Sequence, residues 1–184
     1  MTIHHSPFPD VVISDQTITE RVFANLETRP DQTVLTDGPS GRSLSAAEFM
    51  DQVKRLAGGL TAAGYGAGKT VALMAPNMPE YCVVFHAVAW AGGTITTLNP
   101  TYTAPEVAHQ LRDSGADLLL TIPMFMETAT EGAGDTPVVA IGTPEFEAMM
   151  GAPVEAQVPV DLDTHSVVLP YSSGTAGLPK GVML

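Results

Sequence analysis

The chain has 184 residues, of which 45% are hydrophobic and 15% are charged; this is the composition of one packed globular domain and excludes a disordered chain. Its net charge of −12 excludes nucleic acid as a partner, because phosphate backbones require a basic face. The same charge argues against binding to an anionic membrane surface.

The first helix is predicted after an irregular N-terminal segment that contains prolines and shows no periodicity. Thr17 and Glu20 have the spacing of a capping box, which marks the start of a helix. The apolar positions that follow fall on one face, and Pro30 lies just beyond the end. Next, Gly38-Pro39-Ser40-Gly41 separates two short β-prone runs, so we expect a small antiparallel hairpin over residues 33–44.

A second capping box, formed by Ser45 and Glu48, marks the start of a longer helix. This helix ends near Gly64, a residue suited to the left-handed position after a helix. The segment Gly64–Thr70 contains Gly-Lys-Thr, but a helix precedes it and a strand follows it. Since a Walker A loop needs the opposite order, we interpret this segment as a helix-to-strand turn. The apolar face of the helix consists of Phe49, Val53, Leu56, Ala57 and Leu60.

Strands and helices alternate regularly over residues 71–141. Such alternation predicts right-handed crossovers and a parallel sheet that helices cover on both faces. The predicted strands are residues 71–75, 94–98, 117–122 and 137–141. The predicted helices are residues 79–90, 104–114 and 123–131.

The predicted helix at residues 79–90 is almost entirely apolar and contains Cys82 and His86. Cys82 is the only cysteine, which excludes an internal disulfide and favours a reducing, cytoplasmic location. We interpret Cys82 as a buried structural thiol and His86 as a hydrogen-bonded core histidine. His109 falls on a mixed helix face and is expected to be solvated. No apolar run is long enough to cross a bilayer, so we expect no stable membrane insertion.

The C-terminal third begins with a predicted connecting loop, residues 151–164, whose acidic side chains we interpret as solvated. The apolar run Ser166–Tyr171 follows and is typical of a buried strand. The predicted fold class is therefore α/β, with a doubly wound, mainly parallel sheet, helices on both faces and a small N-terminal β-hairpin. In such sheets ligands bind beyond the carboxyl ends of the strands.

The segment after this strand has the chemistry of an anion-binding loop. Its glycines let backbone N–H groups turn toward a ligand, its hydroxyls add donors, and its lysine adds a positive charge. A polyphosphate is the matching ligand. The segment is not a Walker A loop, because Lys180 precedes Gly181 and not a serine or threonine. The candidate cofactor-binding residues are Ser172, Ser173, Gly174, Thr175, Ala176, Gly177 and Lys180.

The run Tyr171-Ser172-Ser173-Gly174-Thr175, continued by Gly177-Leu178-Pro179-Lys180-Gly181, resembles the phosphate loop of the adenylate-forming superfamily. This superfamily includes acyl-CoA synthetases, 4-coumarate–CoA ligases, luciferases and the adenylation domains of peptide synthetases. Residues 75–81 and 91–111 resemble its CoA-ligase branch. Ala176 departs from the family, which usually has a second threonine at this position. With one hydroxyl donor fewer, we expect nucleotide binding to be weaker by about tenfold.

The resemblance implies an ATP-dependent carboxylic acid–CoA ligase, similar to 4-coumarate–CoA ligases or fatty acyl-CoA synthetases. Residues 1–15 would be an irregular N-terminal segment, and residues 16–184 the first part of the large AMP-binding domain, truncated just after the phosphate loop. The implied partners are ATP and a small carboxylic acid. The implied cofactors are ATP, Mg2+ and CoA, the last two held mainly by residues absent from this chain. No catalytic or metal-binding residue is assigned here, and the chain alone is expected to be inactive.

Two alternatives to this function stay open. The acyl acceptor could be a carrier-protein thiol instead of CoA, or oxygen as in luciferases. The chain could also be a truncated, non-catalytic binding module. The sequence determines neither the acid that is activated, because the family's acid pocket is built from later residues, nor the oligomeric state.

Overall fold

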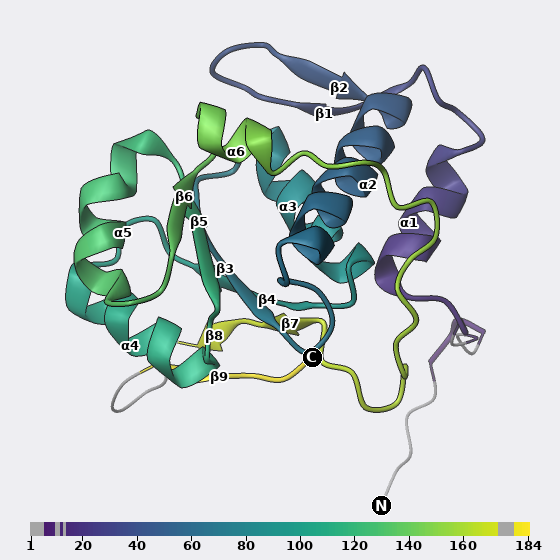
Figure 1. Cartoon of the computed structure of the whole chain (residues 1–184). Coiled ribbons are helices and arrows are strands. Elements are labelled where there is room, and N and C mark those ends of the chain that lie inside the picture. The colour runs from purple at the N-terminus through teal and green to yellow at the C-terminus, as the bar shows by residue number, and fades with distance from the viewer. Residues whose placement is uncertain (1–5, 10–11, 13, 173–178) are drawn as a thin grey trace, which may run out of the picture.

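The computed structural model describes residues 6–9, 12, 14–172 and 179–184. Its centre is a five-stranded parallel sheet with the strand order β6-β5-β3-β4-β7. Two antiparallel hairpins, β1–β2 and β8–β9, lie at the upper and lower ends of the molecule in Figure 1. The strands are β1 (Thr33–Thr36), β2 (Ser43–Ser45), β3 (Thr70–Met74), β4 (Thr94–Leu98), β5 (Leu118–Thr121), β6 (Val138–Ala140), β7 (Val168–Leu169), β8 (Tyr171–Ser172) and β9 (Lys180–Gly181).

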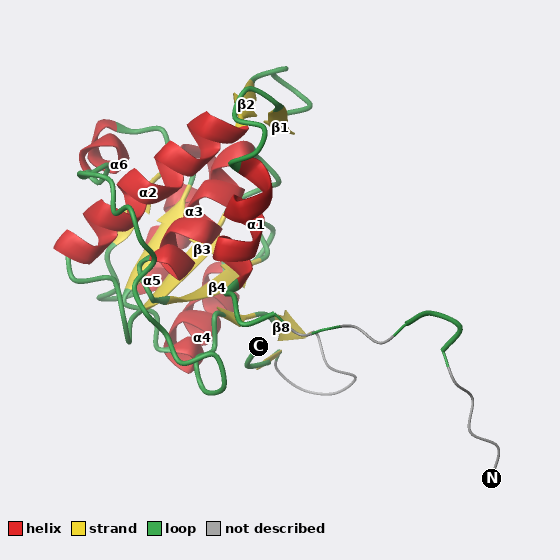
Figure 2. Ribbon diagram, turned by 90° about the vertical axis from the view of Figure 1, so that its right-hand side faces the viewer, coloured by secondary structure: helices red, strands yellow, loops and turns green. Residues whose placement is uncertain are grey.

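Helices cover both faces of the sheet, as the sequence predicts. One face is covered by α1 (Ile18–Leu26), α2 (Ala46–Ala62) and α3 (Pro79–Trp90), which lie side by side in Figure 2. The other is covered by α4 (Ala104–Ser114), a short 3-10 helix (Pro123–Phe125) and α5 (Met126–Ala133). Alternate residues of β3 are buried in the two cores, with Val71 and Leu73 on the α3 side and Ala72 and Met74 on the α4 side. The doubly wound α/β prediction is therefore confirmed.

Local sequence signals determine where the main helices begin. The N–H groups of Thr17, Ser45 and Thr103 each donate to the glutamate three residues later, at 2.8 Å. These bonds satisfy donors that the first turn of a helix leaves without intrahelical partners. The Gly64–Thr70 segment is a helix-to-strand turn, as predicted, with Gly64 at φ 84° and Gly68 at φ 74°.

The predicted strand over residues 166–171 differs from the structure. β7 is only two residues long and half-buried, and its parallel pairing with β4 stops before Pro170. Because proline has no N–H, it cannot continue a ladder from that position. The chain then leaves the parallel sheet, and β8 pairs with β9 instead. A short helix, α6 (Pro144–Ala148), was also not predicted; Thr143 caps it and Phe146 is its buried residue.

The segment Met149–His165 runs across the helices on the α3 side and joins β6 at one edge of the sheet to β7 at the other; we call it the strap (Figure 1). Its backbone bonds to α2 through the Gly151 N–H and the Arg55 carbonyl, 3.0 Å apart. The Trp90 indole N–H donates to Val154 O at 2.7 Å. The strap therefore packs on the helices, although the sequence predicts only a connecting loop.

Candidate functional site

The strand order identifies one position where a ligand crevice is expected. From β3 the chain moves outward to β4, then returns across β3 to form β5 and β6 on its other side. The crossover after β3 passes over one face and the crossover after β4 over the other. At such a reversal, the loops after β3 and β4 diverge and leave a crevice beyond the carboxyl ends of the strands.

A cavity of about 430 Å3 lies at this position. It is lined by the last two residues of β4, by residues that follow β3 and β4, and by Pro170 and Tyr171 at the start of the β8–β9 hairpin. None of the described residues that line it is charged. Its polar side chains, which suit an uncharged, hydrogen-bonding part of a ligand, include Asn77, Tyr81, Asn99 and Tyr102.

The β8–β9 hairpin places two of the predicted phosphate-binding residues next to each other. Ser172 pairs directly with Lys180, and Tyr171 pairs with Gly181. Directly opposed residues of an antiparallel pair lie on one face, with Cβ atoms about 5 Å apart. Both Ser172 and Lys180 are exposed. A hydroxyl and an ammonium group on one exposed face match the oxygens of a phosphate group, which accept hydrogen bonds and carry negative charge.

The remaining predicted phosphate-binding residues, Ser173, Gly174, Thr175, Ala176 and Gly177, lie outside the described residues. The donors at Ser172 and Lys180 fit phosphate oxygens, but they supply no carboxylate. Mg2+ is usually bound by one or two carboxylates together with the phosphates of a nucleotide. In the part of the chain that the structure describes, no group of three or more histidine, cysteine or acidic side chains could hold a metal ion. A magnesium ion would therefore need the nucleotide itself and groups beyond this pair.

Tyr171 connects the hairpin to α4. Its hydroxyl donates to Asp113 Oδ2 at 2.6 Å. Burial, together with the hydrogen bond to the Asp113 carboxylate, raises the pKa of Tyr171 well above its usual value. Gly181 lies under the ring, and a Cβ at this position would be 3.2 Å from Tyr171 Cζ. The glycine thus allows the aromatic ring to lie closely against the opposite strand.

The sequence predicts that His109 is solvated, and the structure shows otherwise. It is half-buried, and its Nε2 lies 3.2 Å from the carbonyl oxygen of Pro179, the residue before Lys180. The sequence gives no signal for this contact, because it joins residues 70 positions apart. His86 is hydrogen-bonded as predicted, with Nδ1 2.8 Å from Thr19 Oγ1, but it is half-buried and not fully enclosed in the core.

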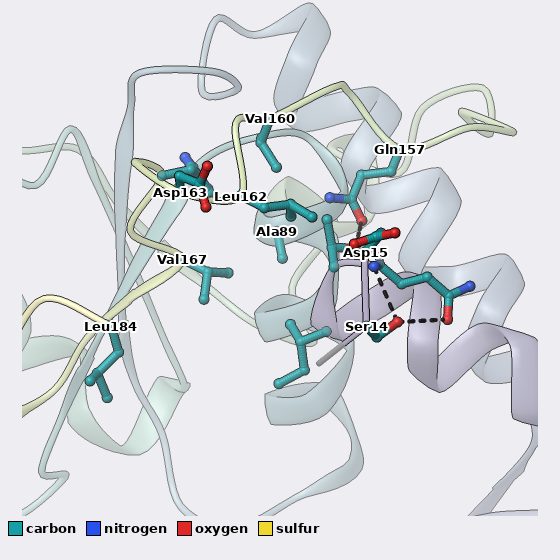
Figure 3. Close-up of a pocket in the computed structure, with 13 residues that line it drawn as sticks. Ser14, Asp15, Ala89, Gln157, Val160, Leu162, Asp163, Val167 and Leu184 are labelled. Carbon is teal, nitrogen blue, oxygen red and sulfur yellow. Dashed lines mark hydrogen bonds between the residues drawn. The ribbon is translucent and has the colours of Figure 1, made fainter. Parts of the chain in front are cut away.

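A larger cavity, of about 520 Å3, lies at the opposite end of the strands (Figure 3). Its walls come from the segment that leads into α1, the end of α3, the strap, the residue before β7 and the C-terminal Leu184. Thr17 Oγ1 donates to Gln157 Oε1 at 2.7 Å, and His165 Nε2 is buried without a hydrogen-bond partner among the described residues. We assign the candidate site to the carboxyl edge despite the smaller volume, because Tyr171 lines the crevice there and belongs to the hairpin that contains Ser172 and Lys180.

Relatives of the chain are found along nearly its whole length. The family model of the AMP-binding enzymes matches residues 22–184. The curated protein 4-coumarate–CoA ligase 5 of Oryza sativa subsp. japonica is 39% identical over 189 residues, which cover 99% of this chain and 35% of the relative. The chain thus spans about a third of the length of the curated relatives that it matches.

Solved structures agree in fold. A long-chain-fatty-acid–CoA ligase from Archaeoglobus fulgidus superposes with a TM-score of 0.88 and 26% identity, covering 98% of this chain and 38% of that one. The o-succinylbenzoate CoA synthetase of Bacillus subtilis, in complex with ATP and magnesium ion, has a TM-score of 0.73 and 27% identity, covering 91% of this chain and 43% of that one.

Proposed function

The chain belongs to the AMP-binding enzyme family, and on this premise we propose that it is part of an ATP-dependent ligase that joins a carboxylic acid to the thiol of CoA. The observation that carries the proposal is the pairing of Ser172 with Lys180 at the carboxyl edge of the parallel sheet. The two residues flank the segment 173–178, whose composition predicts a phosphate loop. The CoA-ligase activity of the relatives supports the choice of acceptor.

The proposed reaction has two steps. In the first, a carboxylate oxygen of the acid attacks the α-phosphorus of ATP, and the bond from that phosphorus to the oxygen bridging to the β-phosphorus breaks. Pyrophosphate leaves with the electron pair of the broken bond, and the acyl-adenylate remains. In the second step, the sulfur of CoA attacks the acyl carbon and its thiol proton is released. The bond from the acyl carbon to the AMP oxygen breaks, and AMP leaves as the thioester forms.

The roles of this chain's residues concern the first step. The Ser172 hydroxyl and the Lys180 ammonium bind the β- and γ-phosphates and hold them in line for departure. Lys180 also stabilises the charge that develops on pyrophosphate as the bond breaks. Ser173, Gly174, Thr175 and Gly177 are predicted to add hydroxyl and backbone N–H donors around the same phosphates. Bound magnesium would neutralise part of the phosphate charge.

An aromatic acid of the 4-coumarate type is the proposed substrate. The support is the 39% identity with the rice 4-coumarate–CoA ligase, compared with 26% for the archaeal fatty-acid–CoA ligase. A medium-chain fatty acid is the alternative substrate that a panel of acids would reveal.

The first test is acid-dependent exchange of labelled pyrophosphate into ATP by the protein expressed from its complete reading frame. Exchange with 4-coumarate, and thioester formation when CoA is added, are the expected results. Lys180→Ala should lower the exchange rate by about 100-fold, because a charge that stabilises the transition state is lost. Lys54→Ala is the matched control: it removes the same charge from an ion pair with Glu155, away from the hairpin, and should change little.

Three results would contradict the proposal. Exchange that is equally fast in Lys180→Ala and Lys54→Ala would exclude Lys180 from phosphate binding. Absence of exchange with every acid would favour a non-catalytic module. Acid-dependent exchange without a thioester on free CoA would instead favour a carrier-protein acceptor.

A further inference from the structure

Helix α4 contacts both arms of the β8–β9 hairpin, and we propose that it acts as a clamp that positions Ser172 and Lys180 for phosphate binding. Asp113 and His109 are the positioning residues. They lie four positions apart on α4, so they share one side of the helix. This inference rests on the function proposed above, and it assigns to α4 a role in the ATP step.

The first contact fixes the arm that contains Ser172. Tyr171 precedes Ser172, and its hydroxyl donates to Asp113 Oδ2 at 2.6 Å. A short bond to a carboxylate belongs to the stronger class of hydrogen bonds in proteins. Tyr171 also pairs across the hairpin with Gly181, so a bond that holds its ring orients both strands.

The second contact fixes the arm that contains Lys180. His109 Nε2 lies 3.2 Å from the carbonyl oxygen of Pro179. Because a carbonyl only accepts hydrogen bonds, this nitrogen must carry the proton and donate it. The contact is therefore maintained by the neutral Nε2–H tautomer and by the protonated ring alike. Pro179 is joined directly to Lys180, so the bond restrains the start of the lysine's strand.

A third connection holds the strand that leads into the hairpin. The buried Gln110 donates through Nε2 to Thr96 Oγ1 at 2.8 Å, and the Thr96 hydroxyl donates to the carbonyl oxygen of Leu169 at 2.8 Å. Leu169 is the last residue of β7 and lies two positions before Tyr171. Gln110 lies between His109 and Asp113 in the sequence, so one stretch of α4 supplies all three connections.

Packing alone does not hold the hairpin against α4. A cavity of about 110 Å3 lies between them and is lined by His109, Gln110, Tyr171 and Pro179, among others. Close packing would leave few gaps of this size. The side-chain hydrogen bonds therefore contribute to holding the hairpin against α4, in addition to the backbone bonds between residues 182–184 and 167–170, and removing one should change the positions of Ser172 or Lys180. A hairpin ordered before ATP binds loses less conformational entropy on binding, which is the energetic benefit of the clamp.

The test compares variants of the protein expressed from its complete reading frame. Tyr171→Phe and Asp113→Ala each remove the same hydrogen bond, and each should raise the KM for ATP by about three- to tenfold, while the KM for the acid stays the same. The double variant should be no worse than either single variant, because the two residues act through one bond. His109→Leu should have an effect of similar size. His109→Gln, whose amide can donate to the same carbonyl, should have a smaller one.

The rate of amide hydrogen exchange, measured in the absence of nucleotide, provides a second and independent test of the clamp. The amide of Val182 donates to the Pro170 carbonyl within the hairpin, at 2.9 Å. Tyr171→Phe and His109→Leu should speed exchange of the amides at 180–182 and leave those of β3 unchanged. Arg112→Gln is the matched control, because Arg112 is exposed on the same helix and no described contact joins it to the hairpin.

The outcomes separate the clamp from the proposed function. If Tyr171→Phe and His109→Leu match Arg112→Gln in both the KM for ATP and the hairpin exchange rates, the clamp is overturned. If wild-type protein makes no acyl-adenylate while the variants still speed hairpin exchange, the proposed function fails and the clamp on the hairpin stands. Equal increases in the KM values for ATP and acid would also contradict the clamp, because they would indicate a general loss of structure.

Discussion

The imidazole of His86 lies within the helices on the α3 side of the sheet, and its surroundings change its acid–base chemistry. Its Nδ1 is 2.8 Å from Thr19 Oγ1, and the rings of Phe49 and Phe85 meet it at steep angles with centroids 5.6 and 5.3 Å away. Burial disfavours the charged imidazolium and lowers the pKa of His86 to about 4. The folded protein therefore holds this ring neutral at neutral pH.

Stability should consequently fall as the pH is lowered from about 6.5 to about 4. In this window the unfolded chain binds a proton at His86 and the folded chain does not, so protonation favours unfolding. The pKa difference corresponds to about 3 kcal/mol. Urea unfolding should show that the free energy of unfolding of the wild type falls across this pH range. In His86→Gln, which has no titrating group at this position, the fall should be smaller by about 3 kcal/mol. Parallel pH profiles for the two proteins would contradict the expectation.

At the scale of elements, the contact between α2 and the strap depends on two adjacent glycines. A Cβ on Gly59 would lie 1.5 Å from the carbonyl oxygen of Met149, and one on Gly58 would lie 1.9 Å from that of Ala152. These are backbone atoms, which cannot rotate aside as the end of a side chain can. Glycine weakens a helix by about 1 kcal/mol relative to alanine, so its presence here reflects the passage of the strap.

Gly59→Ala should therefore destabilise the protein by about 3 kcal/mol or more, although alanine is the better helix former. Gly38→Ala, in the turn of the β1–β2 hairpin, is the control, because nothing lies within 4 Å of the added Cβ. Its effect should stay within about 0.5 kcal/mol. The free energies of unfolding of the two variants are measured by urea titration. Equal values for the two variants would refute the steric explanation.

For the whole molecule, the dominant electrostatic feature is an excess of acidic groups. The chain has 20 acidic and 8 basic residues, which gives the net charge of −12. Within the described residues, ion pairs join Arg42 to Glu80, Lys54 to Glu155 and Lys69 to Asp117. Most acidic groups thus have no basic partner to balance them, and repulsion among them opposes the compact state.

Added salt should therefore stabilise the folded protein. Raising NaCl from about 0.01 M to about 0.5 M shortens the screening length from about 30 Å to below 8 Å and weakens this repulsion. Salt also screens the exposed ion pairs, but this lowers the free energy of unfolding only slightly, since each pair contributes about 0–1 kcal/mol. We expect a net gain of about 1 kcal/mol in the free energy of unfolding at pH 7, measured in urea. A decrease with salt would show that attractive pairs outweigh the repulsion. Sulfate is unsuitable for this test, because it also strengthens hydrophobic burial.

The helices, most strands and the class of the fold could be predicted from the sequence. Capping boxes act over three residues, and apolar periodicity acts within one element. The helix starts at Thr17 and Ser45 and the apolar helix α3 could therefore be predicted without knowing which segments pack against them. The resemblance to the family was also visible in short local segments, above all in the contiguous run from Tyr171 to Gly181, and the family model matches residues 22–184. Of the predicted phosphate-binding residues, Ser172 and Lys180 lie together in the structure, and the others stay predictions.

The way in which these elements contact one another could not be predicted, because it depends on the folded arrangement. The strand order and the path of the strap over Gly58 and Gly59 depend on packing between distant segments. The contacts of α4 with the hairpin join residues 58 and 70 positions apart. Such contacts leave no local pattern, because each partner is an ordinary residue within its own helix or loop. Their free energy arises only when the folded sheet has brought the two elements together.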